Sequence, residues 1–344
     1  MSDAHISIRG LYKIFGKRPE SALAKVLAGT NKDDLLNNHG HVLGLQDINL
    51  EIPRKKIQVI MGLSGSGKST LIRHFNRLIE PTAGEVWVDG QNVLTLNKQE
   101  LMTFRREKMS MVFQRFALLP HRTIIENVRY GLDIQGVSDA DAKERAIHWI
   151  ERVGLAGQED QYPGQLSGGM QQRVGLARAL ATDADILLMD EAFSALDPLI
   201  RTEMQNILLE LQRELHKTIV FITHDLDEAL KLGDNIAILR DGAIVQTGAP
   251  EDIVLRPADD YVADFMKDIN RGRVLTLASV IKPTGDATMA LPVHTTLEDA
   301  SIACCDAPGG QAKVIDDEGE TLGYVSLKDL IKAQARPEVA AYDS

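Results

Sequence analysis

A glycine-rich stretch that begins at residue 62 has the residue types and spacing needed to hold phosphate groups. It reads Gly-Leu-Ser-Gly-Ser-Gly-Lys-Ser-Thr and follows an apolar run, residues 57–61, that we expect to be a strand. Glycines let successive backbone N–H groups turn toward a phosphate, and the positive end of a following helix adds to the attraction. The residues expected to bind the nucleotide are Gly62, Ser64, Gly65, Ser66, Gly67, Lys68, Ser69 and Thr70.

Two adjacent carboxylates, Asp190 and Glu191, follow a second apolar run, residues 186–189. Such a run is typical of a parallel strand buried on both faces, and open α/β sheets bind ligands at the carboxyl ends of their strands. We expect Asp190 to hold the water shell of a Mg²⁺ that Ser69 also binds, and Glu191 to orient and deprotonate an attacking water. Without the phosphate loop upstream, a solvated strand end would explain this pair equally well.

The most specific pattern is Leu-Ser-Gly-Gly-Met-Gln-Gln-Arg at residues 166–173. A serine and two glycines at the start of a helix offer a hydroxyl, free backbone amides and a helix N-terminus, which together make a second phosphate site. A simple helix cap would account for the serine but not for both glycines. Because one bound nucleotide needs one γ-phosphate site per chain, we expect this turn to serve a nucleotide held by a second copy. The residues concerned are Ser167, Gly168, Gly169 and Gln171.

Alternating apolar runs and helical patterns from residue 57 to about 248 predict an α/β layered fold around these motifs. A polar, partly helical insertion at 17–44 interrupts its beginning. Helices are expected at 250–253 and 260–269, and a domain boundary between 272 and 273. The remainder, 273–344, is expected to be a small α+β domain with a loop at 281–295, a helix start at Thr296, a hairpin of 313–315 with 321–325, and a helix from Leu327.

Composition limits the classes of function. The net charge of −11 argues against a protein that grips nucleic acid, although it leaves local phosphate binding open. No segment approaches the roughly 20 apolar residues that span a bilayer, and the first residues lack the pattern of a signal peptide. We therefore expect a cytosolic chain whose membrane role would come through a partner. The adjacent Cys304 and Cys305 are expected to be reduced.

Residues 6–270 resemble the ABC ATPases, on the strength of these motifs and three further matches. Gln114 resembles the Q-loop glutamine, Asp197 the D-loop aspartate and His224 the switch histidine. The resemblance implies that ATP is bound with Mg²⁺ in a head-to-tail homodimer, between the phosphate loop of one copy and Ser167 of the other. It further implies that Gln114 binds the metal and assists catalysis, that Asp197 contacts nucleotide and that His224 contacts the γ-phosphate and the attacking water. Phe15 stands where the family has an aromatic residue stacked on adenine.

The insertion at 17–44 and the run 63–81 resemble the ATPase subunits of glycine betaine, proline and choline importers. That resemblance implies peripheral attachment to the cytoplasmic face of the plasma membrane, permease subunits and an extracytoplasmic substrate-binding protein. Residues 115–121 are then expected to receive the permease, or else to be an internal loop. The alternatives are an importer of another small solute, such as an amino acid, and a soluble ABC ATPase of DNA repair or translation. Residues 314–330 resemble part of a regulatory CBS module, although a structural appendage is equally compatible.

Overall fold

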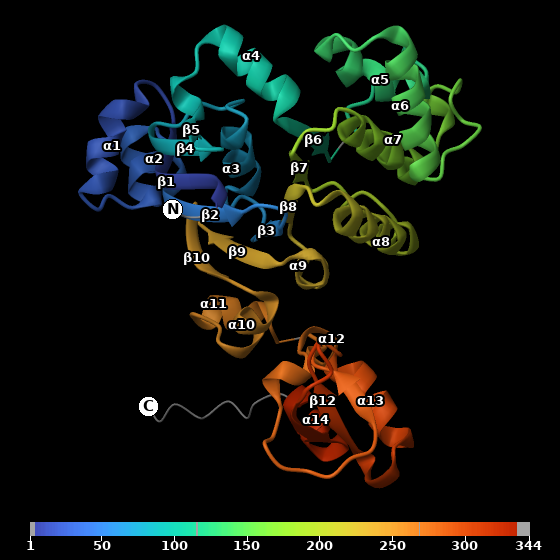
Figure 1. Ribbon diagram of the computed structural model, residues 1–344. Coiled ribbons are helices and arrows are strands. Elements are labelled where there is room, and N and C mark those ends of the chain that lie inside the picture. Colours follow the sequence, from blue (N-terminus) through green and yellow to red (C-terminus); the bar gives the residue numbers. More distant parts are fainter. Residues whose placement is uncertain (1–3, 115, 268, 336–344) are drawn as a thin grey trace. The chain divides into compact units, whose positions relative to one another are not determined.

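A computed structural model describes residues 4–114, 116–267 and 269–335 (Figure 1). The chain forms two compact units, Met1–Ala249 and Pro250–Ser344. The expected boundary between residues 272 and 273 falls inside α12 (Arg271–Val274) of the second unit. Arg271 donates to the Val254 carbonyl and Glu251 accepts from the Thr276 backbone, so α10 (Pro250–Leu255) belongs with the residues that follow it.

A six-stranded sheet forms the centre of the first unit. Its strands, in spatial order, are β10 (Ala243–Gly248), β9 (Asn235–Arg240), β3 (Ile57–Met61), β8 (Thr218–Thr223), β7 (Ile186–Asp190) and β6 (Met109–Phe113). Pairs from β9 to β6 are parallel, and β10 runs antiparallel to β9. Every residue of β3, β7 and β8 is buried, and β3 and β7 confirm the strands expected from the apolar runs at 57–61 and 186–189.

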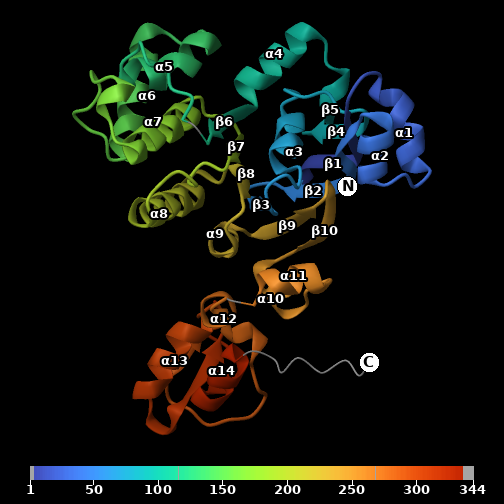
Figure 2. The ribbon, with the colours of Figure 1, turned by 180° about the vertical axis from the view of Figure 1, so that it is seen from behind.

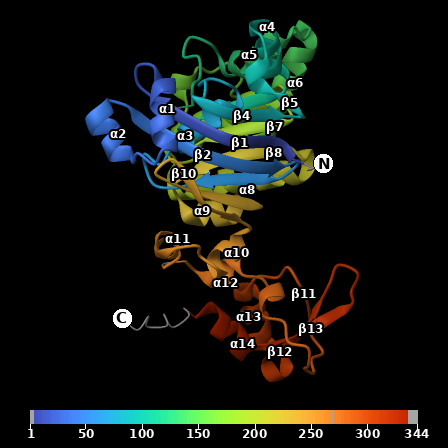
Figure 3. The ribbon, with the colours of Figure 1, turned by 90° about the vertical axis from the view of Figure 1, so that its left-hand side faces the viewer.

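A second, antiparallel sheet packs against the first across the main apolar core. Figure 3 shows its long strands from the side. Its order is β2 (Val42–Pro53), β1 (Ala4–Phe15), β4 (Ala83–Val88) and β5 (Gln91–Asn92). The core joins Ile8 and Ile48 of this sheet to Leu188 and Ile222 of the other. Phe75, on α3 (Lys68–Phe75), is fully buried in the same cluster, so the core fixes the helix that follows the phosphate loop.

Three helices form a group with an apolar core of its own (Figure 2). They are α5 (Ile124–Gln135), α6 (Asp139–Arg152) and α7 (Gly168–Ala181). Thr123, Ser138 and Ser167 cap their N-termini, which is the local reason that each helix begins where it does. Other helices of the first unit are α4 (Lys98–Glu107), α8 (Pro198–Leu215) and α9 (Leu226–Leu232).

The insertion contains α1 (Pro19–Leu27) and α2 (Lys32–His39), which confirms its partly helical character. Both helices pack on β1 and β2, the strands that precede and follow the insertion. Val26 and Leu35 are buried in one cluster with Ile14 of β1 and Leu43 of β2. The two helices lie next to the ends of these strands in Figure 3.

The second unit contains a three-stranded sheet in the order β11 (Ala290–Pro292), β12 (Gln311–Ile315) and β13 (Thr321–Ser326). Strands β11 and β12 are parallel and β12 and β13 antiparallel, so the expected hairpin is confirmed. The expected loop at 281–295 was wrong in part, because β11 lies within it and pairs with β12. The helices of the second unit are α10, α11 (Asp260–Phe265), α12, α13 (Leu297–Asp306) and α14 (Leu327–Gln334). The helix expected over 260–269 ends at Phe265, and residue 268 lies outside the described residues. Across both units, no helix in the described ranges could cross a membrane.

Candidate active site

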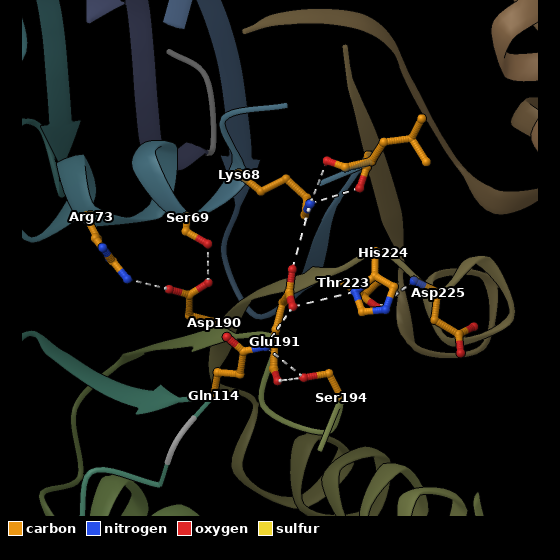
Figure 4. Close-up of polar contacts among 12 residues, drawn as sticks. Lys68, Ser69, Arg73, Gln114, Asp190, Glu191, Ser194, Thr223, His224 and Asp225 are labelled. Carbon is orange, nitrogen blue, oxygen red and sulfur yellow. Dashed lines mark hydrogen bonds and ion pairs between the residues drawn. The ribbon is translucent and has the colours of Figure 1, made fainter. Parts of the chain in front are cut away.

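The carboxyl ends of four neighbouring strands meet at one edge of the six-stranded sheet. Register pairs Met61 with Thr223, Ile222 with Asp190 and Asp190 with Phe113, so β3, β8, β7 and β6 end almost level. The residues that follow these strands are the phosphate loop, His224, Glu191 and Gln114. Figure 4 shows how their side chains converge.

The phosphate loop can turn so tightly because glycine stands at its closest approaches. Gly62 has a φ of 155°, and a Cβ there would lie 2.3 Å from the Leu239 carbonyl oxygen. Lys68 Nζ donates to the carbonyls of Gly62 at 2.8 Å and Leu63 at 3.1 Å. Burial lowers the pKa of Lys68, while Glu191, whose carboxylate is 3.8 Å away, acts in the opposite direction. The ammonium therefore bonds to the backbone of its own loop.

Asp190 is almost fully buried and held by two residues of α3. Ser69 Oγ donates to one carboxylate oxygen at 2.8 Å, and Arg73 Nη2 lies 3.3 Å from the other. Ser69 and Arg73 are one helical turn apart and therefore share a face of the helix. The predicted pair of metal-binding residues, Ser69 and Asp190, is thus in direct contact. Arg73 received no role from the sequence, although its spacing from Ser69 could have indicated one.

Glu191 is the residue on which the other side chains converge (Figure 4). Its Oε2 accepts from Gln114 Nε2 at 3.1 Å and lies 3.5 Å from His224 Nδ1. Its backbone has a φ of 47°, a left-handed conformation that costs energy for a residue with this side chain. Ser194 Oγ donates to the Glu191 carbonyl at 2.9 Å and also accepts from Gln114. The contacts of Gln114 therefore run to the candidate base and Ser194.

A pocket of about 310 Å³ extends from Glu191 and the phosphate loop to the aromatic ring of Phe15. Phe15 is 40% exposed, and Lys13 Nζ lies 5.0 Å from its ring centre. The lining residues predicted from the sequence are Phe15, Ser64, Gly65, Gly67, Lys68, Ser69, Thr70 and Glu191. Lys32, from α2 of the insertion, also lines the pocket and was missed because no local motif marks it.

The serine–glycine turn borders a different pocket, of about 400 Å³, with Ser167, Gly169, Met170 and Ile200 in its wall. Ser167 Oγ accepts from the Met170 backbone at 3.3 Å, and Gln171 donates to the Leu166 carbonyl. Gly168 opens the same helix. Asp197 caps α8 by accepting from Ile200. These residues, predicted from the sequence to contact nucleotide, are thus separate from the pocket that Lys68 lines.

Another contact that the sequence did not reveal joins α7 to the loop after Gln114. Arg178 donates to the carbonyls of Phe116 at 3.1 Å and Ala117 at 2.7 Å. Both of these residues have left-handed backbones, with φ of 52° and 49°. Burial lowers the pKa of Arg178. Since left-handed backbones are costly outside glycine, the guanidinium helps to hold this loop in shape.

Comparisons with known proteins identify relatives of this chain. A family model described as ABC transporter matches residues 45–194. The glycine betaine/carnitine transport ATP-binding protein GbuA of Listeria monocytogenes is 55% identical over 276 residues, 80% of this chain and 70% of that protein. The trimethylamine N-oxide transport system ATP-binding protein TmoW of Ruegeria pomeroyi is 50% identical over 338 residues, 97% of this chain and 99% of that protein. The dimeric ATP-binding cassette MJ0796, in a post-hydrolysis state bound to ADP and Pi, has a TM-score of 0.61 at 32% identity and covers 71% of this chain and 98% of that one.

Fold and site together define a P-loop ATPase, with the phosphate loop after β3 and the carboxylate pair at the end of β7. The chain belongs to the ATP-binding proteins of ABC transporters, which hydrolyse ATP to drive transport.

Proposed function

We propose that this chain powers the import of glycine betaine, choline or proline through a partner ABC permease. The observation that carries the ATPase part is the convergence of Lys68, Gln114 and His224 on Glu191. The cargo is proposed from the relatives, whose names specify glycine betaine, carnitine and trimethylamine N-oxide. All of these solutes carry a methylated nitrogen.

In the proposed reaction, a water oxygen attacks the γ-phosphorus while the bond to the β–γ bridging oxygen breaks and ADP leaves. Glu191 accepts the proton of that water, and Gln114 and His224, which already contact its carboxylate, orient the water. Lys68 leaves the carbonyls of Gly62 and Leu63 to hold the β- and γ-phosphates. The charge that develops on the phosphate oxygens is stabilised by this ammonium and by the loop amides.

The contact between Ser69 and Asp190 fits Mg²⁺. A hydroxyl oxygen and a carboxylate oxygen 2.8 Å apart are hard donors, and Mg²⁺ in nucleotide sites keeps waters and phosphate oxygens as its other ligands. No cluster of three or more His, Cys, Asp or Glu side chains among the described residues could hold a metal alone, so phosphate and water would complete the shell. When bound, Mg²⁺ neutralises charge on the β- and γ-phosphates. We propose Gln114 as a further contact to this shell.

We propose that the functional unit is a homodimer in which Ser167, Gly168, Gly169, Gln171 and Asp197 of one copy complete the nucleotide site of the other. The placement of Ser167 beside a second pocket, away from Lys68, supports this arrangement. The dimeric state of MJ0796 with ADP and Pi offers a precedent. A two-fold interface would then contain two equivalent sites.

We propose that the chain works with permease subunits and an extracytoplasmic substrate-binding protein, and that it attaches to the cytoplasmic face of the membrane. In the expected docking segment, residues 115–121, Leu118 packs into the helical core and both backbone groups of Leu119 bond to Asn127. Arg115 of this segment lies outside the described residues. We therefore place the permease contact at a mostly apolar groove of about 240 Å³ that includes Met109, Tyr130 and Ile134. Tyr130 and Ile134 are both more than a third exposed.

For the second unit we propose a CBS-like regulatory role, with a structural appendage as the alternative. The order β11, α13, β12, β13, α14 gives one strand–helix–strand–strand–helix repeat, which supports the resemblance. One such repeat in the chain would have to pair with its copy in the dimer.

Uptake in cells tests the proposal. Cells lacking this gene, and cells complemented with either the natural chain or the Glu191→Gln variant, would be supplied with labelled glycine betaine, choline or trimethylamine N-oxide. We expect that only the natural chain restores uptake to the cells lacking the gene. We also expect the natural chain to co-purify with a hydrophobic permease. Normal uptake of all three solutes without the gene, or a soluble complex with ribosomes or DNA, would exclude the importer.

A further inference from the structure

The insertion packs as one unit with the part of the pocket that Phe15 and Gly44 line. Leu35 of α2 is fully buried among Ile14, Val26 and Leu43. Ile14 is the neighbour of Phe15, and Leu43 is the neighbour of Gly44, which also lines the pocket. Lys32 precedes Leu35 by three residues, about one helical turn, so its backbone is held by the same cluster.

Lys32 holds only a weak ion pair in this position. Its Nζ lies 3.5 Å from Asp241 Oδ1, and the Asp241 side chain is 72% exposed. An ion pair at this distance, with side chains this exposed to solvent, contributes little to stability. Asp241 belongs to the turn between β9 and β10, where the Gly242 backbone donates to the Ser66 carbonyl of the phosphate loop. The pair therefore lies beside the phosphate loop, at the mouth of the pocket.

We propose that Lys32 is an additional nucleotide-binding residue, whose ammonium leaves Asp241 and contacts the phosphate chain of bound ATP. Among the described residues, the other charged side chains that line this pocket are Lys68 and Glu191. A nucleoside triphosphate brings several negative charges, and a charge-assisted contact to phosphate is stronger than the exposed pair with Asp241. The inference rests on nucleotide binding alone, so its failure would leave the proposed import function untouched.

Competition between phosphate and Asp241 predicts effects of opposite sign. Lys32→Gln, which keeps most of the length and removes the charge, should weaken ATP binding about tenfold. Asp241→Asn should tighten it about twofold, because Lys32 then has no competing carboxylate. Asparagine tolerates the left-handed backbone of Asp241, whose φ is 51°. Lys32→Arg should bind ATP nearly as well as the natural chain.

The experiment is an equilibrium titration of the full chain with a fluorescent ATP analogue and Mg²⁺, at low and high ionic strength. Lys25→Gln is the matched control, because Lys25 is a lysine of the same insertion that contacts His39 rather than lining the pocket. We expect ATP binding to be weaker in Lys32→Gln and unchanged in Lys25→Gln. The difference between Lys32→Gln and the natural chain should become smaller at high salt, because salt screens the contact between charges. Equal losses in Lys25→Gln and Lys32→Gln, or none in Lys32→Gln, would overturn the proposal.

The double variant Lys32→Gln/Asp241→Asn separates competition from an indirect effect on folding. If Asp241 acts only by holding Lys32, then Asp241→Asn should change nothing once Lys32 is glutamine. A gain that persists in the double variant would show that Asp241 acts on the nucleotide directly, which contradicts the proposed competition. Thermal unfolding of each variant is the accompanying check, and unchanged unfolding midpoints are expected because both side chains are partly exposed.

Discussion

The side-chain amide of Gln114 lies 3.1 Å from the carboxylate of Glu191, which joins the loop after β6 to the candidate base after β7. The same loop continues into Phe116 and Ala117, whose carbonyls are held by Arg178 of α7. The helix that begins after Ser167 thus contacts the same loop whose Gln114 bonds to the carboxylate proposed as the base.

Replacing the base should separate ATP binding from hydrolysis. Glu191→Gln keeps the shape of the side chain and removes its ability to accept a proton, so turnover should fall by about 10²–10⁴ while ATP affinity changes little. Phosphate release and nucleotide binding by the purified variant measure the two effects. Turnover near that of the natural chain would refute the role of Glu191.

A mixture of two damaged chains tests the shared site. In a dimer of one Lys68→Ala chain and one Ser167→Arg chain, one composite site carries both changes and the other is intact. We expect each variant alone to be inactive and the mixture to recover part of the ATPase activity. Full activity of either variant by itself would rule out the arrangement in trans.

Loss of Arg178 should disturb catalysis through the loop that it holds. Arg178→Met keeps the apolar stem but leaves the Phe116 and Ala117 carbonyls without this donor, so we expect about a tenfold loss of turnover with little change in ATP affinity. Arg178→Lys should recover part of the loss. An equal fall in affinity and turnover would indicate general unfolding instead, and thermal unfolding is the control.

The stability of the fold should decrease in acid because of His74. Burial lowers the pKa of His74 to about 4, although its bond to the Thr70 carbonyl acts in the opposite direction. The unfolded chain takes up this proton near pH 6.5 and the folded chain only near pH 4, so folding stability rises with pH across that window and is lost as pH falls. The contribution is roughly 3 kcal/mol. Denaturant unfolding at several pH values measures the free energy of unfolding of the natural chain and of His74→Gln. This free energy should depend less on pH in the variant than in the natural chain.

The sequence predicted those parts of the site that follow from local pattern. The run at 57–61 leads into the phosphate loop and the run at 186–189 into the carboxylate pair, and their burial as parallel strands brings Lys68 and Glu191 together as expected. Lys32 and Arg178 could not be found this way, because their contacts depend on tertiary packing between segments far apart in the chain. The short strand β11 was missed for a similar reason: three residues gain their strand character only by pairing with β12.

The left-handed backbone of Glu191 implies a trade-off between stability and turnover. A glycine at this position would adopt the same φ of 47° without steric cost, so Glu191→Gly should relieve local strain even as it removes the base. If Glu191 is the base, selection for fold stability and selection for ATP hydrolysis act in opposite directions on this residue. A Glu191→Gly variant that hydrolyses no ATP but unfolds at a higher temperature than the natural chain would show this conflict directly.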